Sequence, residues 1–138
     1  SGGKSILAKD VLGNIDLTVS DIREPILHNL KKRSAKAGIT QYKSFMTDLA
    51  NPTSPSPLPT PDSFDLIIAD VPCTGSGTWS RTPEQLCFFD TKKTTAYAGL
   101  QKKILTNVLT SLQSGGHLLY CTCSVFKKEN APRVRFGF

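Results

Sequence analysis

The fold is predicted chiefly from Phe64-Asp-Leu-Ile-Ile-Ala-Asp-Val-Pro-Cys-Thr-Gly-Ser-Gly77. Residues 64–69 form a nearly continuous apolar run, which is typical of a strand buried on both faces of a parallel sheet. The loop that follows, 70–83, opens with an acid, a proline and a thiol. We therefore predict a buried strand whose carboxyl end carries a reactive loop, because ligands of parallel sheets bind at that end.

The segments on either side of this strand alternate between strand and helix patterns. Strands are predicted over 15–19, 42–45 and 117–120, and helices over 6–12, 22–37 and 94–113. This alternation indicates an open, doubly wound, mostly parallel α/β sheet. The chain, 1–138, is expected to form a single domain with a proline-rich loop at 52–61.

Composition narrows the classes of partner. Seventeen Lys and Arg against eleven Asp and Glu give a net charge of +6, which suits a polyanion but also suits solvated helix faces. No apolar run is long enough for a membrane span, and the first residues lack the basic-then-apolar pattern of a signal peptide, so a membrane or secreted protein is not expected. The four cysteines are therefore expected to be free thiols in a reducing compartment. Their spacing and that of the two histidines do not predict a metal site.

The first predicted helix follows a glycine turn, Gly2-Gly3, and an acid, Asp21, comes about 20 residues later. Such a turn lets a ligand approach the backbone at a helix N-terminus, so the pattern predicts a nucleoside cofactor. A simple strand-end cap explains Asp21 equally well. Lys4-Ser5 also resembles the end of a phosphate-binding P-loop, which leaves a nucleotide hydrolase as an alternative.

Two thiols, Cys73 and Cys123, follow two predicted strands. The ends of those strands can lie close together in a doubly wound sheet. Two thiols and the carboxylate of Asp70 around one pocket suit covalent catalysis on an electron-poor ring. The alternative is that both cysteines are small buried core residues.

Two longer motifs carry a family resemblance. Asp70-Val-Pro-Cys-Thr-Gly-Ser-Gly-Thr-Trp-Ser-Arg-Thr-Pro-Glu84 and Tyr120-Cys-Thr-Cys-Ser-Val-Phe-Lys-Lys-Glu-Asn130 resemble signature motifs of the NOL/NOP/Sun family of RNA cytosine carbon-5 methyltransferases. The opening Gly2-Gly3-Lys4 is similar to the end of that family's cofactor loop. The resemblance covers nearly the whole chain. It implies that 1–138 is part of a catalytic domain with the Rossmann-like class I methyltransferase fold.

The resemblance also implies a reaction, in which a methyl group passes from S-adenosylmethionine to carbon 5 of cytosine in ribosomal or transfer RNA. Cys123 would attack carbon 6 to form a covalent adduct, Cys73 would assist the elimination that frees the product, and Asp70 would hydrogen-bond ring nitrogen 3. Pro72 would shape the loop around the base.

By the same resemblance, the cofactor would be held by Gly2, Gly3, Lys4, Asp21, Asp48, Asp70 and Pro72, and the RNA by Arg81, Lys127 and Lys128. A cytoplasmic monomer without a metal is expected.

Other functions stay open at this point. DNA cytosine methyltransferases use a Pro-Cys thiol as the nucleophile and need no second Thr-Cys, and amino-group methyltransferases need no thiol. An inactive RNA-binding remnant is the alternative from another class. The family's first strand, its last strands and its N-terminal RNA-binding region are expected outside these 138 residues. We therefore expect this piece alone to be poorly stable and weakly active.

Overall fold

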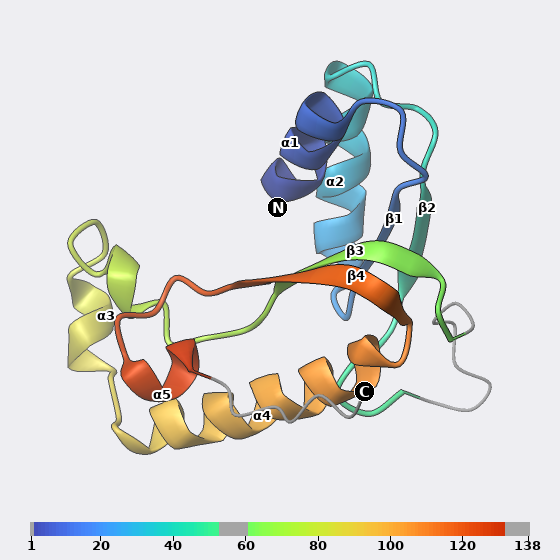
Figure 1. The fold of residues 1–138 in the computed structure, drawn as a ribbon. Helices are drawn as coiled ribbons and strands as arrows, with labels where there is room; N and C mark the ends of the chain where they lie inside the picture. The colour runs from blue at the N-terminus through green and yellow to red at the C-terminus, as the bar shows by residue number, and fades with distance from the viewer. Residues whose placement is uncertain (1, 53–60, 132–138) are drawn as a thin grey trace. The chain divides into compact units, whose positions relative to one another are not determined.

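The computed structural model describes residues 2–52 and 61–131. Contacts divide them into two compact units, the first formed by 2–48 and 52 and the second by 49–51 and 61–131. Figure 1 labels the helices and strands of both. Of the predicted proline-rich loop, residues 53–60 lie outside the described part of the chain.

The first unit consists of α1 (Gly3–Leu12), β1 (Thr18–Asp21), α2 (Glu24–Lys36) and β2 (Lys43–Met46). The two strands pair in parallel, from Thr18 opposite Lys43 to Asp21 opposite Met46. Helix α2 connects them and lies against both strands (Figure 1). Pro25 stands in its first turn, where the missing N–H costs no hydrogen bond. This is the predicted strand–helix–strand unit.

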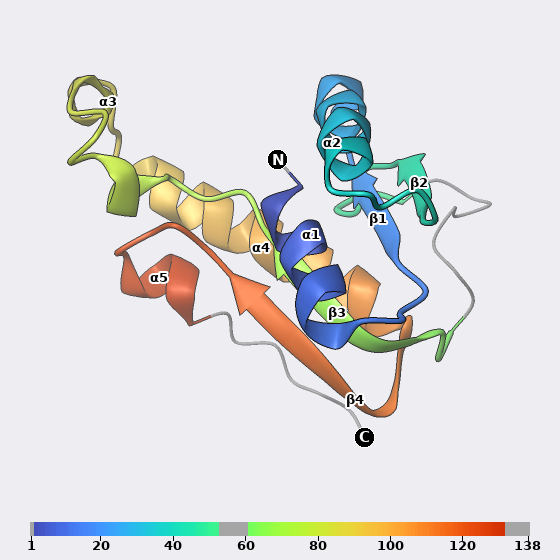
Figure 2. The same ribbon diagram turned by 90° about the horizontal axis from the view of Figure 1, so that it is seen from above.

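The second unit contains β3 (Phe64–Asp70), η1 (Ser76–Thr78), α3 (Glu84–Cys87), α4 (Lys92–Leu109), β4 (Leu112–Cys121) and α5 (Lys127–Asn130). Strands β3 and β4 run in parallel, with Ala69 opposite Tyr120 and Asp70 opposite Cys121. Figure 2 shows the two strands side by side, and α4 connects them. The parallel α/β architecture agrees with the prediction. Among the described residues no ladder joins the two sheets.

One face of the β3–β4 pair forms the core of the second unit. Leu105 of α4 is 1% exposed and clusters with Ala69 and Val71. The opposite face is open within this unit, because Leu66 is 37% and Leu119 52% exposed. The prediction that 64–69 is buried on both faces is therefore wrong for these strands. An apolar run indicates that a strand can be covered on both sides, but it does not supply the second layer.

The glycine pair Gly115-Gly116 belongs to a strand. It lies inside β4, which begins at Leu112, whereas α4 ends earlier, at Leu109. Gly115 has a φ of 78°, and a Cβ on Gly116 would lie 3.0 Å from the carbonyl oxygen of Asp65. The pair therefore allows close approach of the two backbones where the strand register is irregular.

Neither a membrane-spanning helix nor a metal site was predicted from the sequence. Within 2–52 and 61–131, no helix combines the length and the apolar character that a bilayer crossing requires. In the same residues, His, Cys, Asp and Glu side chains do not gather in threes as metal ligands would.

Leu105 tests the core. We expect Leu105→Ala to lower the free energy of unfolding by about 2–5 kcal/mol, because the change leaves a cavity between α4 and β3. Denaturant melts of the protein measure this. Leu86→Ala is the matched control in the same unit, because Leu86 is 59% exposed. Equal losses in both variants would contradict the assigned core.

Candidate active site

The pairing of β3 with β4 continues beyond the strands into the two loops that carry the thiols. The N–H of Val71 donates to the carbonyl oxygen of Cys121 at 3.3 Å, and the N–H of Gly77 donates to that of Cys123 at 2.8 Å. A Cβ on Gly77 would lie 2.9 Å from the Cys123 carbonyl oxygen, so only glycine permits this approach. The two loops are thus held together by backbone hydrogen bonds.

The two predicted catalytic thiols are in contact. The Sγ atoms of Cys73 and Cys123 lie 3.2 Å apart, and both cysteines are free. Asp70, at the carboxyl end of β3, is exposed. Partial burial raises the pKa of the Cys123 thiol, and the hydrogen bond and charge of Cys73, followed by the charge of Asp70, raise it further. Asp70 therefore acts electrostatically on this thiol.

Hydroxyl groups of Thr74, Ser76 and Ser124 connect the two loops that carry the thiols. The Oγ of Ser124 lies 3.3 Å from the Oγ1 of Thr74 and 3.2 Å from the Oγ of Ser76. Ser76 is buried, and its Oγ accepts a hydrogen bond from the N–H of Val125 at 2.9 Å. These contacts connect each thiol loop to the other through short side chains, which leave little freedom for either loop to move alone.

The sequence assigned no role to two buried polar side chains of this region. Glu129 is fully buried, and its carboxylate accepts hydrogen bonds from the N–H of Thr74 at 3.1 Å and from the Thr74 hydroxyl at 2.8 Å. Gln101 is also fully buried, and its Nε2 donates to the carbonyl oxygen of Pro72 at 2.9 Å. Glu129 is the next-to-last residue of the second quoted motif, so its place in that motif was the available signal.

The Glu129 backbone is itself held in place. The Tyr120 hydroxyl donates to the carbonyl oxygen of Glu129 at 2.6 Å, and burial raises the pKa of Tyr120 to about 12. The hydroxyl therefore keeps its proton, and this hydrogen bond, throughout the physiological range.

The predicted RNA-binding residues lie on the surface of the same unit. Arg81, Lys127 and Lys128 are all exposed, and the Nζ of Lys128 lies 3.4 Å from the Oγ1 of Thr95. Pro72 is exposed as well, in the loop directly after Asp70. These positions are accessible to a large partner.

An aromatic cluster lies beside the Cys123 loop. The ring of Phe126 stacks on Phe89 with centroids 5.1 Å apart, and Trp79 meets Phe89 edge-on at 4.9 Å. The cluster ties α5 to the segment around α3, because its three rings come from three separate stretches of the chain.

The predicted cofactor residues of the first unit lie at or near the ends of its helices and strands. Gly2 caps α1 with a φ of 81°, and a Cβ there would lie 2.6 Å from the Cδ1 of Leu30. Gly3 and Lys4 form the first turn of α1. The glycine turn before a helix that a nucleoside cofactor needs is therefore present.

Asp21 and Asp48 complete this set. Asp21 ends β1, and its Oδ1 accepts hydrogen bonds from the N–H of Arg23 at 2.9 Å and from the Nε of Arg23 at 3.1 Å. The hydrogen bond and the charge of Asp21 raise the pKa of Arg23. Asp48 follows two residues after β2 and is half-buried. A carboxylate at the end of β1 fits a ribose-binding role.

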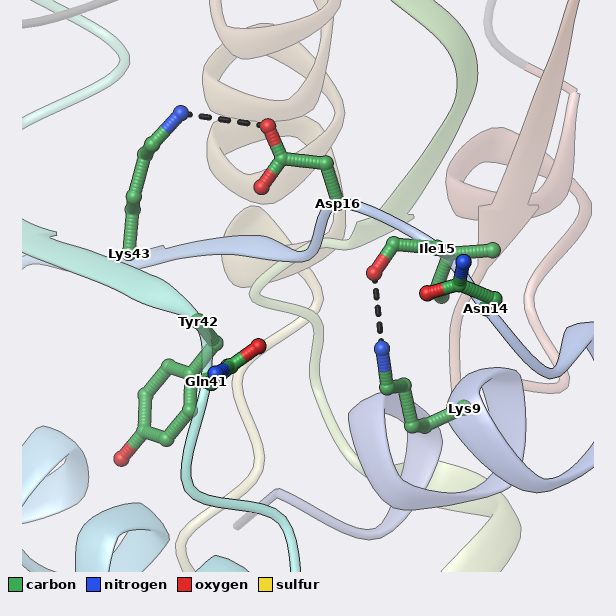
Figure 3. A pocket seen from close by; sticks show the side chains of 7 residues that line it. All are labelled: Lys9, Asn14, Ile15, Asp16, Gln41, Tyr42 and Lys43. Carbon is green, nitrogen blue, oxygen red and sulfur yellow. Dashed lines mark hydrogen bonds and ion pairs between the residues drawn. The ribbon is translucent and has the colours of Figure 1, made fainter.

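A cavity of about 510 Å³ lies elsewhere in the first unit, as Figure 3 shows. It is lined by Lys9, Asn14, Ile15, Asp16, Gln41, Tyr42 and Lys43. Both lysines are engaged locally, since the Nζ of Lys9 donates to the carbonyl oxygen of Ile15 at 2.7 Å and the Nζ of Lys43 lies 3.1 Å from Asp16. The cavity is at the amino ends of β1 and β2, so it is separate from the predicted cofactor residues.

Comparison with known proteins identifies the family. The family model described as 16S rRNA methyltransferase RsmB/F matches residues 1–136. The chain belongs to this RsmB/F family. This bears out the resemblance drawn from the two motifs around Cys73 and Cys123.

Curated relatives of this RsmB/F chain act on two kinds of RNA, according to their names. It is 31% identical over 119 residues to the mouse tRNA (cytosine(72)-C(5))-methyltransferase NSUN6, covering 80% of this chain and 24% of the mouse protein. It is 30% identical over 138 residues to the ribosomal RNA small subunit methyltransferase B of Salmonella newport, covering 97% of this chain and 30% of that protein. The chain thus spans about a quarter to a third of the length of these relatives.

Solved structures confirm the Rossmann-like methyltransferase fold of this family member. PH0851 matches with a TM-score of 0.81 and 27% identity, over 94% of this chain and 28% of that one. NSun6 from Pyrococcus horikoshii, solved with SFG, matches with a TM-score of 0.77 and 25% identity, over 93% of this chain and 32% of that one.

The pKa of Cys123 gives a test of the contact between the thiols. We expect Cys73→Ala to shift the pH midpoint for alkylation of Cys123 by iodoacetamide to lower pH, because the hydrogen bond and charge that raise this pKa are removed. Mass spectrometry of peptides measures the rate at each pH, with the exposed Cys87 of the same sample as the reference. An unchanged midpoint would show that the two sulfurs do not interact.

Gly77 tests the backbone contact between the loops. Gly77→Ala places a Cβ against the Cys123 carbonyl oxygen, so we expect the free energy of unfolding to fall by about 1–3 kcal/mol. The matched control is Gly99→Ala in α4, where a Cβ meets no atom of the described residues within 4 Å. That change is expected to raise stability by about 0.5–1 kcal/mol. Denaturant melts compare the two, and equal effects would refute the close approach.

Proposed function

We propose that this protein transfers a methyl group from S-adenosylmethionine to carbon 5 of cytosine in RNA. The observation that carries the proposal is the contact of two free thiols, Cys73 and Cys123, at 3.2 Å in the loops that follow β3 and β4. A DNA-type mechanism needs only the Pro-Cys thiol, and amino-group methylation needs none. The second thiol therefore favours the RNA reaction, and membership of the RsmB/F family supports it.

The chemistry follows from the weak nucleophilicity of carbon 5. The Cys123 thiolate adds to carbon 6 of the ring, and the electron pair displaced by this bond is stabilised by Asp70 at nitrogen 3. When bound, S-adenosylmethionine supplies the electrophilic methyl group that carbon 5 then accepts. Solvent water then takes the proton from carbon 5, and the bond between carbon 6 and the Cys123 sulfur breaks with its electron pair on sulfur, which restores the aromatic ring. Cys73 assists this elimination.

Cofactor binding is assigned to Gly2, Gly3, Lys4, Asp21 and Asp48 of the first unit and to Asp70 and Pro72 of the second. The glycine turn at α1 and the carboxylate that ends β1 support the assignment for the first unit. The NSun6 structure was solved with SFG, an analogue of S-adenosylmethionine, which agrees with this cofactor.

RNA binding is assigned to Arg81, Lys127 and Lys128, which are exposed on the unit that carries the thiols. The net charge of +6 supports a polyanionic substrate. Relatives methylate ribosomal or transfer RNA by their names, so both remain candidate substrates. The target base has to leave its stack for the Cys123 sulfur to reach carbon 6. We place the protein in the cytoplasm as a monomer without a metal.

Covalent trapping tests this function. RNA that contains 5-azacytidine allows attack and methyl transfer but offers no carbon-5 proton to remove, so the adduct should persist. We expect incubation with S-adenosylmethionine to give a denaturant-resistant adduct whose peptide mass maps to Cys123. Cys123→Ser should abolish it, whereas Cys87→Ser, the change of an exposed thiol, should leave its yield intact.

Two other results of the trapping experiment would change the proposal. An adduct on Cys73 would exchange the roles of the two thiols. The absence of any adduct from protein shown by circular dichroism to be folded would refute the enzymatic function and favour the RNA-binding remnant.

A further inference from the structure

Helix α5 is a single turn, and two successive residues at its end contact different thiol loops. Glu129 contacts the Cys73 loop through both polar groups of Thr74, at 3.1 and 2.8 Å. Asn130 contacts the Cys123 loop, where its Nδ2 donates to the carbonyl oxygen of Ser124 at 2.7 Å and its Oδ1 accepts from the Thr122 hydroxyl. Each contact falls on a residue adjacent to a thiol-bearing residue.

The loop that carries Cys73 is held on both sides of the thiol. Gln101 of α4 binds the carbonyl oxygen of Pro72, and Glu129 binds Thr74. Both side chains are fully buried, and a buried carboxylate or amide is tolerated only where it forms hydrogen bonds. Burial of a carboxylate costs free energy that an apolar side chain in the same place would not cost. The position of Glu129 against Thr74 therefore indicates that the conformation of the Cys73 loop depends on it.

The loop that carries Cys123 is held in the same manner. Asn130 binds the residue before Cys123 through the Thr122 side chain and the residue after it through the Ser124 backbone. An amide side chain can do both because it has a donor and an acceptor. Because Glu129 and Asn130 are neighbours, the turn of α5 fixes the two loops relative to each other.

We propose that Glu129 and Asn130 are positioning residues that set the separation of the two thiols, Glu129 through the Cys73 loop and Asn130 through the Cys123 loop. The catalytic consequence rests on the proposed function. Loss of the Glu129 contact impairs release of the adduct, which needs Cys73. Loss of the Asn130 contact impairs its formation, which needs Cys123.

The separation itself can be measured without RNA. Diamide oxidises two adjacent thiols to a disulfide, the two electrons and two protons reducing diamide to its hydrazine. We expect Glu129→Gln and Asn130→Ala to slow the formation of the Cys73–Cys123 disulfide at least about fivefold. The matched controls Glu24→Gln and Asn29→Ala, at exposed positions of α2, should leave the rate unchanged. Unchanged rates in the α5 variants would overturn the proposal whether or not the protein is a methyltransferase.

The two steps are separated with RNA. On RNA with ordinary cytosine, Glu129→Gln is expected to accumulate the covalent adduct and to lower turnover at least about tenfold, while adduct formation on 5-azacytidine RNA changes less than about threefold. Asn130→Ala is expected to slow adduct formation at least about tenfold without accumulation. Equal slowing of both steps in both variants would show a merely structural role. If the unchanged protein forms no adduct, the proposed function fails, but the disulfide measurement still decides the positioning.

A second variant covers the case in which Glu129→Gln does not fold. Thr74→Val removes the hydroxyl donor from the other side of the same contact with almost no change of shape. It should reproduce the Glu129→Gln pattern, and Thr74→Ser, which keeps both donors, should restore the behaviour of the unchanged protein. A Thr74→Ser variant that behaves like Thr74→Val would contradict the role of this hydrogen bond.

Discussion

The site depends on the parallel register of β3 and β4, in which Asp70 lies opposite Cys121. The pairing continues through the hydrogen bond from Gly77 to Cys123, so the loops leave the sheet already aligned. A shift of one residue would turn every side chain of one strand to the other face. It would also move one thiol loop by about 3.3 Å along the strand direction, the distance between consecutive residues of a strand. A shift of that size would break the 3.2 Å contact between the two sulfurs. The backbone pairing of β3 with β4 therefore determines which side chains meet at the site.

The loop that follows β3 is held by a buried polar side chain, that of Gln101. The Nε2 of Gln101 binds Pro72, whereas its Oε1 has no hydrogen-bond partner among the described residues. An unpaired buried oxygen costs about 1–3 kcal/mol. The apolar contacts around Leu105 on the same helix offset part of this cost. The helix thus combines ordinary core packing with a polar contact that serves the loop instead of stability.

The sequence was sufficient to predict the parts of this structure that follow from local pattern and from motifs. The apolar run of β3, the strand–helix–strand order and the meeting of Cys73 with Cys123 belong to this group. Coverage of the sheet was not predictable, because Leu66 and Leu119 are apolar whether or not a layer packs on them. The role of Glu129 was not predictable either, since sequence spacing does not reveal that a carboxylate eight residues beyond β4 turns back to Thr74.

The contact between the thiols has a chemical logic under the proposed reaction. A thiol whose pKa is raised, as that of Cys123 is, gives a thiolate of high intrinsic nucleophilicity but also a poor leaving group. The raised pKa also lowers the fraction of Cys123 that is thiolate near neutral pH, so it slows attack on the ring as well as elimination. A second thiol at 3.2 Å is placed to exchange a proton with the same sulfur, and so to assist the step that a single thiol performs badly. The burial that raises the pKa of Cys123 therefore creates the need for a neighbour that can exchange a proton with its sulfur, and Cys73 is in that position.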